Sequence, residues 1–128
     1  MYPPLWVNFS VLYPLTVESV RTNAPASPGI YEFRLKGQGM ESPNGKTPII
    51  YIGGSRNIKK RLRDHLGKSN KNGRIRDFLR KHECSFRYIR FSTPHFRKSA
   101  GWREKEKELY KSFVATYGSA PECNMVRP

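Results

Sequence analysis

The chain has 128 residues, a formal charge of +14, and 37% hydrophobic residues. This length suits one domain with one modest core, and no apolar run approaches the roughly 18 residues that a membrane-spanning helix needs. The large positive charge favours an acidic polymer as partner. Residues 1–20 contain no Lys or Arg, which argues against a secretory signal, so we expect a cytoplasmic protein with no membrane partner.

The first half of the chain predicts one short helix and two strands. Two valines on one face favour a helix over 15–23, and the prolines of 24–28 keep the next residues extended. Residues 29–36 are largely apolar with partial alternation, which predicts a strand. Residues 37–48 are rich in Gly, Ser, Pro and Asn, which predicts a loop. The apolar run 49–52 predicts a second strand.

A basic helix follows the second strand. Ser55 or Asn57 can act as its N-cap, because either side chain can accept a hydrogen bond from the first turn. Ile58, Leu62 and Leu66 (or the preceding His) recur on one helical face, which predicts the face that packs on the core.

The remaining chain predicts a short helix ending near residue 82, an alternating strand over 84–91 and a long helix over 100–117, before an irregular tail. The predicted order of the elements is strand, strand, helix, helix, strand, helix. This order is typical of a small α/β (α+β) fold. We therefore expect a central antiparallel or mixed three-stranded sheet flanked by helices. The two cysteines, Cys84 and Cys123, form no closely spaced pair, and we expect reduced, partly buried thiols.

Most of the positive charge lies in one stretch. Residues 56–81 include eleven basic and two acidic side chains, so this stretch carries +9 of the net +14. A merely soluble surface usually mixes the two signs, and the concentration of one sign favours nucleic-acid binding. The candidate phosphate-binding residues of this stretch are Arg56, Lys59, Lys60, Arg63, Lys68, Lys71, Arg74 and Arg76.

Three polar side chains are predicted to face partly inward. Arg61 and His65 are four residues apart, so they share a helix face with the apolar Leu62 nearby. Such residues suit a cleft, although a snorkelling arginine and an ordinary boundary histidine are alternatives. Glu106 lies on the apolar stripe of the last helix, four residues after Trp102. A carboxylate there calls for a cation or a metal as partner, with a surface ion pair as the alternative.

Two tripeptides connect these residues to a known family. Gly-Ile-Tyr at 29–31 and Tyr-Ile-Gly at 51–53 resemble the signature of the GIY-YIG nuclease family. Further along the chain, Arg61, His65, Glu106 and Asn124 fall in the order that this family uses. The resemblance covers residues 29–124. Its connection between the tripeptides is longer than usual in the family, and we interpret the extra residues as an insertion rather than a loop that contacts substrate.

The resemblance implies a metal-dependent endonuclease that hydrolyses phosphodiester bonds in DNA. It implies that Glu106 binds one Mg²⁺ (or Mn²⁺) and that Arg61 neutralises charge on the phosphate. Tyr31 and Tyr51 would flank the attacking water, one of them as general base with His65 as helper. Because a free phenol titrates near pH 10, that role needs a cationic neighbour such as Arg61 or the metal. Asn124 would brace the site or contact substrate.

Several alternatives remain open. A catalytically idle or RNA-directed binding module of the same fold explains the charge, and a ribosome-associated basic protein does so without explaining Glu106. We divide the chain into a lead-in over 1–28 that packs on the domain and a GIY-YIG-like nuclease domain over 29–128. DNA is the expected partner, and a protein that supplies specificity is a second. Substrate structure and oligomeric state are not predicted.

Overall fold

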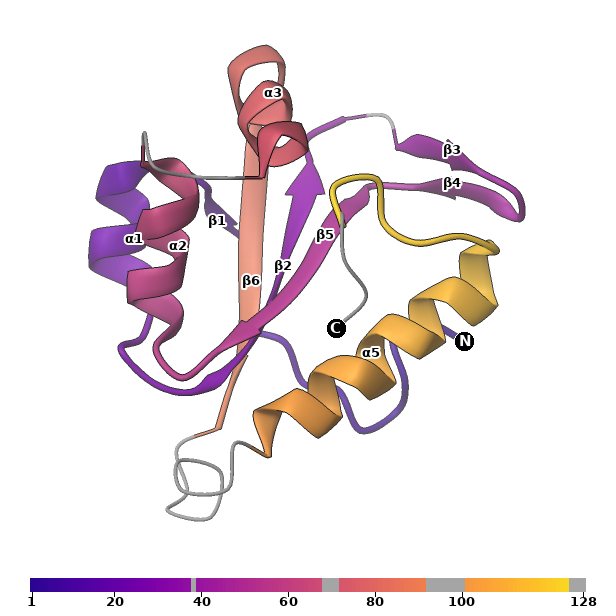
Figure 1. The fold of residues 1–128 in the computed structure, drawn as a ribbon, viewed down its shortest axis with the longest axis horizontal. Helices are drawn as coiled ribbons and strands as arrows, with labels where there is room; N and C mark the ends of the chain where they lie inside the picture. Colours follow the sequence, from indigo (N-terminus) through magenta and orange to yellow (C-terminus); the bar gives the residue numbers. More distant parts are fainter. Residues whose placement is uncertain (38, 68–71, 92–100, 125–128) are drawn as a thin grey trace.

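The computed structural model describes residues 1–128 except 38, 68–71, 92–100 and 125–128 (Figure 1). A four-stranded sheet lies at its centre, with the spatial order β1-β6-β2-β5 and every neighbouring pair antiparallel. Its strands are β1 (Tyr13–Pro14), β2 (Gly29–Leu35), β5 (Ile49–Ser55) and β6 (Cys84–Arg90).

The prediction of three strands was wrong by one. Tyr13 and Pro14 pair with Phe86 and Ser85 at the outer side of β6. Two residues are too short to show an alternating pattern, and a proline usually marks a strand edge. β1 therefore forms a short edge strand that no local signal in the sequence indicates.

Helices cover both faces of this sheet, as Figure 1 shows. The helices α1 (Val17–Asn23), α2 (Ile58–Leu66) and α3 (Gly73–Lys81) contribute side chains to one core cluster, which includes Tyr31 of β2. The helix α5 (Trp102–Tyr117) packs on the other face, against a cluster that includes Ile30 of β2. Successive residues of β2 thus face opposite layers, as the pleat of a strand requires. No helix of the described ranges is both long and apolar enough to span a membrane.

The predicted loop over 37–48 holds a second, two-stranded sheet. Its strands are β3 (Met40–Ser42) and β4 (Gly45–Thr47), which pair antiparallel. Both strands are short and mostly polar, so their composition predicts a loop rather than strands. The backbone N–H of Asn44 in the turn donates to the carbonyl of Tyr117 at the end of α5, at 3.1 Å. Residues 40–47 therefore form an ordered hairpin docked on α5.

The caps of α2 and α3 follow from asparagine side chains. Asn57, rather than Ser55, is the N-cap of α2, and its side chain accepts a 3.1 Å hydrogen bond from the Lys60 N–H. Asn72 caps α3 in the same way, accepting from the N–H groups of Arg74 and Ile75. These bonds satisfy N–H groups that the first turn of a helix leaves unpaired.

Residues 1–10, which we call the strap, connect α5 to the sheet. At the helix, Ser112 Oγ donates a 2.7 Å hydrogen bond to the Met1 carbonyl, and the Tyr2 ring meets that of Phe113 edge-on at 5.3 Å. At the sheet, the N–H of Ser10 donates to the Tyr88 carbonyl at 2.8 Å. The strap thus packs on both elements, while the division of the chain at residue 28 stays a prediction.

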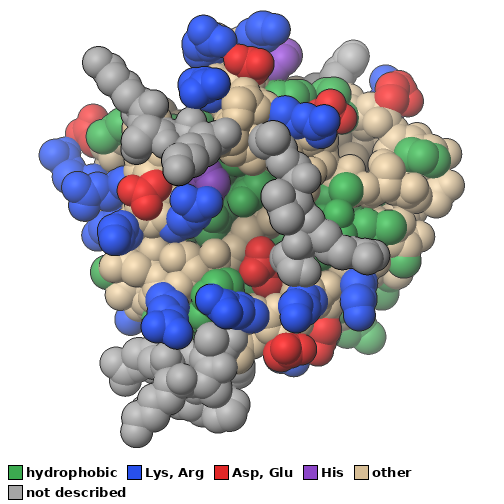
Figure 2. Space-filling view, viewed as in Figure 1, with side chains coloured by type: hydrophobic (Ala, Val, Ile, Leu, Met, Phe, Trp, Pro, Cys, Tyr) green, Lys and Arg blue, Asp and Glu red, His purple; other side chains and the backbone are tan. Residues whose placement is uncertain are grey.

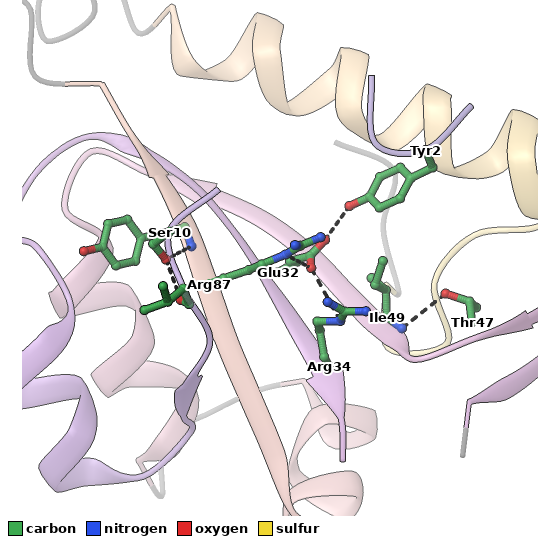
Figure 3. Close-up of polar contacts among 9 residues, drawn as sticks. Tyr2, Ser10, Glu32, Arg34, Thr47, Ile49 and Arg87 are labelled. Carbon is green, nitrogen blue, oxygen red and sulfur yellow. Dashed lines mark hydrogen bonds and ion pairs between the residues drawn. The ribbon is translucent and has the colours of Figure 1, made fainter. Parts of the chain in front are cut away.

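A buried carboxylate under the strap escaped the sequence analysis. Glu32 of β2 is fully buried, and it accepts hydrogen bonds from the Tyr2 hydroxyl and from Nε of Arg87, while Nε of Arg34 lies 3.8 Å away (Figure 3). The Arg87 guanidinium also lies 4.0 Å from the centroid of the Phe9 ring. A buried charge is tolerated only when it is paired and hydrogen-bonded, so this cluster fixes the strap to the sheet.

Both cysteines are buried and free, as predicted. Burial raises the pKa of Cys84 to about 11 and that of Cys123 to about 12. Their thiols therefore stay protonated at neutral pH and act as small apolar side chains.

Candidate active site

The centre of the candidate site is a contact between Tyr31 and His65. The Tyr31 hydroxyl and His65 Nε2 share a 2.8 Å hydrogen bond between β2 and α2, and both side chains are buried. The ring of Tyr51 lies edge-on to the His65 ring at 5.3 Å and 6.1 Å from that of Tyr31. Three of the predicted site residues are thereby brought together from three different elements.

The histidine is neutral at physiological pH. Burial, and then the positive charge of Arg61, lower the pKa of His65 to about 3. A neutral imidazole keeps one ring nitrogen as a hydrogen-bond acceptor. His65 is therefore able to accept a hydrogen bond from a neighbouring hydroxyl.

The tyrosines respond to Arg61 less than expected. Burial raises the pKa of Tyr31 well above its usual value, and the neighbouring Tyr51 adds to the increase, while Arg61 opposes it. Burial also raises the pKa of Tyr51, again against the effect of Arg61. Arg61 thus lowers the pKa of both phenols in the direction expected, but in the ligand-free protein desolvation outweighs this single cation.

Glu106 is the one carboxylate of α5 that turns toward the sheet. It is half-buried, whereas Glu104 and Glu108 are exposed, in agreement with the helix phase. Burial raises the pKa of Glu106 to about 7, although Arg103 and Lys107 lower it. Among the described residues no ion pair involves this carboxylate, and no three His, Cys, Asp or Glu side chains cluster closely enough for a metal.

Two consecutive glycines make room for these side chains. A Cβ on Gly53 would lie 2.7 Å from the Tyr31 hydroxyl and from the Tyr51 ring. A Cβ on Gly54 would lie 2.7 Å from the Trp102 ring and 2.9 Å from the Glu106 carboxylate. The sequence analysis missed Gly54, although a glycine pair at the end of a strand is a recognised sign of close approach.

Gly29 allows a close backbone approach. A Cβ there would lie 2.0 Å from the Ile89 carbonyl oxygen of β6. The first glycine of the signature thus allows β2 and β6 to pair closely.

Asn124 binds the free edge of β5. Its side-chain N–H donates to the Ile52 carbonyl at 2.9 Å, and its side-chain oxygen accepts from the Ile52 N–H at 3.0 Å. Ile52 lies between Tyr51 and Gly53, so the asparagine holds the strand that supports the site. Of the two roles left open for Asn124, this geometry favours bracing.

The predicted phosphate-binding residues are mostly at the surface. Arg56, Lys60, Arg63, Arg74 and Arg76 are exposed, as is Arg61, and Lys59 is half-buried. Lys68 and Lys71 lie outside the described residues. Figure 2 shows Lys and Arg side chains gathered beside α2 and in a row along α5, with an acidic side chain at the surface between them.

Residues 28–117 match the family model of the GIY-YIG catalytic domain. The chain belongs to the GIY-YIG family. This is a family of nucleases, and the two tripeptides of its signature lie side by side here, because Tyr31 of β2 is paired with Gly53 of β5.

Two similar solved structures are of one and the same domain. One is the N-terminal endonuclease domain of UvrC from Thermotoga maritima, bound to magnesium as its catalytic divalent cation. Its sequence is 22% identical to this chain and the TM-score is 0.51. The match covers 84% of this chain and 98% of that chain. A tyrosine point mutant of the same domain, also bound to its catalytic cation, has 20% identity and a TM-score of 0.49, with 85% and 98% covered. The first likeness shows a shared fold. A search of curated proteins found no match.

Proposed function

We propose that this chain is a metal-dependent endonuclease that hydrolyses phosphodiester bonds in DNA. The observation that carries the proposal is the hydrogen-bonded pair of Tyr31 and His65, with Arg61 beside it. The half-buried Glu106 lies close by, next to Gly54 of β5. Phosphodiester hydrolysis needs a proton acceptor for water, a cation at the phosphate and stabilisation of the leaving oxygen. This set contains candidates for the first two.

Glu106 suits one Mg²⁺ or Mn²⁺. Its raised pKa reflects a carboxylate whose charge is poorly solvated, and a nearby cation would relieve that cost. Mg²⁺ in phosphate-processing sites is commonly held by one or two carboxylates together with water and phosphate oxygens, so a single protein carboxylate is sufficient. When bound, the ion would supply Lewis-acid stabilisation of the phosphate and the leaving oxygen.

Tyr31 and His65 are proposed to move the proton of the attacking water. Tyr31 stays a neutral phenol, because burial raises its pKa. Its oxygen takes a proton from the water while its own proton passes to His65 Nε2, so that one proton enters the pair and the histidine becomes cationic. Burial, the larger cause of the low pKa of His65, opposes that cation, whereas the negative phosphate entering beside Arg61 would offset the guanidinium charge, the smaller cause.

Arg61 is the proposed phosphate ligand. Its side chain is exposed, yet its charge acts on both tyrosines and on His65. A guanidinium in this position can donate two hydrogen bonds to phosphate oxygens and stabilise the charge that develops there. The Tyr51 ring packs against the rings of Tyr31 and His65, and Tyr51 would border the attacking water.

The test is a nicking assay on supercoiled plasmid and branched DNA with Mg²⁺ or Mn²⁺. We expect the wild type to cut, and Glu106→Gln and Arg61→Ala to lose at least about 100-fold in rate. Glu104→Gln is the matched control, because it removes an exposed carboxylate from the same helix. A wild type that cuts no DNA, or a Glu106→Gln variant as fast as Glu104→Gln, would contradict the proposal.

The same assay separates the alternatives. A chain that binds DNA without cutting it would be an idle module, and one that cuts or binds only RNA would be RNA-directed. The cytoplasmic location and a protein partner that supplies specificity remain proposals on which the geometry has no bearing.

A further inference from the structure

A row of cations on α5 lies outside the basic stretch of the sequence. Arg103, Lys107 and Lys111 follow one another at four-residue intervals, so they line one side of the helix, and all three are exposed. We call these three residues the α5 row. Figure 2 shows Lys and Arg side chains in a line where Figure 1 places α5.

The α5 row is not neutralised by its own helix. Within the described parts of the chain, the ion pair found on α5 joins Lys105 to Glu108 at 3.6 Å and leaves the row unpaired. The Arg103 guanidinium lies 5.2 Å from the Trp102 ring centroid, and that ring packs against the Gly54 backbone. One cation of the row is thus positioned next to the strand that supports the site.

The row is also close to the proposed metal ligand. Arg103 and Lys107 are the two charges that lower the pKa of Glu106, so both lie near the carboxylate. On the other side of the site, Arg61 acts on Tyr31, and α2 carries further exposed cations. Because α2 and α5 both pack against β5, the candidate site lies between the cations of α2 and the α5 row.

We propose that the α5 row binds the phosphates of duplex DNA on the opposite side of the cleaved bond from α2, so that one duplex spans both helices. This rests on the proposed nuclease function. Residues four apart rise about 6 Å along a helix, so the row spans about 12 Å. That is three to four phosphate-to-phosphate intervals along one strand, at about 3.4 Å each. The aromatic ring beside Arg103, that of Trp102, is buried and is therefore not available for stacking on unpaired bases.

The first test measures DNA binding without cleavage. The full chain is titrated onto a labelled duplex of about 25 base pairs in EDTA at several salt concentrations, comparing the wild type with the variant Arg103→Gln/Lys107→Gln/Lys111→Gln. Each phosphate contact contributes about 0.9 to the slope of log K against log salt. We expect the slope to fall by between two and three, and the affinity at 0.1 M salt to fall at least about tenfold.

A control of equal charge excludes a general electrostatic effect. Arg21→Gln/Lys36→Gln/Lys46→Gln removes three cations from α1, from the residue after β2 and from β4, where each forms a surface ion pair. We expect its slope to change by less than one. If the control weakens binding as much as the α5 row variant, the row is not a specific contact and the proposal is overturned.

The second test locates the contacts. In a footprint on DNA nicked at the cutting position, loss of the α5 row should shorten protection on one side of the nick, and Lys60→Gln/Arg63→Gln on α2 should shorten it on the other. Shortening on the same side would overturn the proposal. The first test measures binding alone, so it stands even if no cleavage is found, whereas the footprint needs a known cutting position. A chain that cuts DNA can still fail both tests.

Discussion

The Tyr31 hydroxyl lies 2.8 Å from His65 Nε2, although the two residues are 34 positions apart and neither side chain is exposed. Burial raises the pKa of the phenol and lowers that of the imidazole. Both groups are therefore neutral in the ligand-free protein. The pair therefore forms a buried hydrogen bond that carries no net charge before substrate arrives.

Replacing His65 should change how stability depends on pH. The pKa of His65 falls from 6.5 when unfolded to about 3 when folded, so between these values the unfolded chain binds more protons. Stability is then lost as the pH falls from 6.5 toward 3. Between pH 7 and 4.5 the wild type should lose about 2 to 3 kcal/mol more than His65→Gln. Urea unfolding of both proteins at both pH values measures the loss of unfolding free energy. If the wild type and His65→Gln lose the same amount, His65 is not the cause of the pH dependence.

Removing the Tyr31 hydroxyl should reduce catalysis far more than folding. We expect Tyr31→Phe to lower kcat by about 10² to 10⁴, as loss of a proton-transfer group does, while stability falls by only about 1 kcal/mol. Single-turnover cleavage and thermal unfolding measure the two effects. Tyr13→Phe, on the distant strand β1, serves as control and should cut normally. A Tyr31→Phe enzyme with normal turnover would exclude the phenol from proton transfer.

Gly53 should tolerate no side chain. Gly53→Ala brings a methyl group to 2.7 Å from both tyrosine rings, and overpacking of this kind costs about 1 to 3 kcal/mol. In Gly73→Ala, by contrast, the nearest atom is 3.5 Å away at the tip of the Arg76 side chain. We expect this control to be neutral or slightly stabilising, because alanine favours a helix more than glycine does. Similar unfolding free energies for the two variants would show that the tyrosines move aside without cost.

Arg87 should contribute strongly to stability. Arg87→Gln leaves the fully buried Glu32 without its principal cation, and removal of one partner of a buried pair typically costs 3–5 kcal/mol. Arg34, at 3.8 Å, remains and limits the loss, so we expect about 3 kcal/mol. Arg90→Gln, an exposed position on the same strand, should cost less than about 0.5 kcal/mol. Chemical denaturation compares the unfolding free energies of the two variants. Equal values for Arg87→Gln and Arg90→Gln would mean that the other partners of Glu32 are sufficient to stabilise it.

Local patterns in the sequence were sufficient for much of the site. The two tripeptides, the strand and helix order and the phase of α5 together identified Tyr31, Tyr51 and the inward-facing Glu106. The family membership is now shown, and the signature strands are neighbours. The catalytic and metal-binding roles remain predictions, since no contact within the ligand-free protein tests them.

What the sequence did not reveal depends on register and on burial. Glu32 and Arg87 are 55 residues apart and meet because β2 and β6 pair in one particular register. The acidity of Tyr31 depends on how deeply its ring is enclosed, which no pattern of spacing reports. The strands β1, β3 and β4 are two or three residues long, too short for periodicity to indicate them.

The side chain of Asn124 also affects how the protein associates with other molecules, because it covers the outer edge of β5. An exposed outer strand invites pairing with a second chain, which leads to aggregation. Here Asn124 occupies both backbone groups of Ile52, and the Cys123 N–H donates to the Ile50 carbonyl at 2.7 Å. The opposite edge is formed by β1, which is only two residues long. Residues 123–124 thus cover the edge of β5, and their removal would leave that edge open to a second copy of the protein.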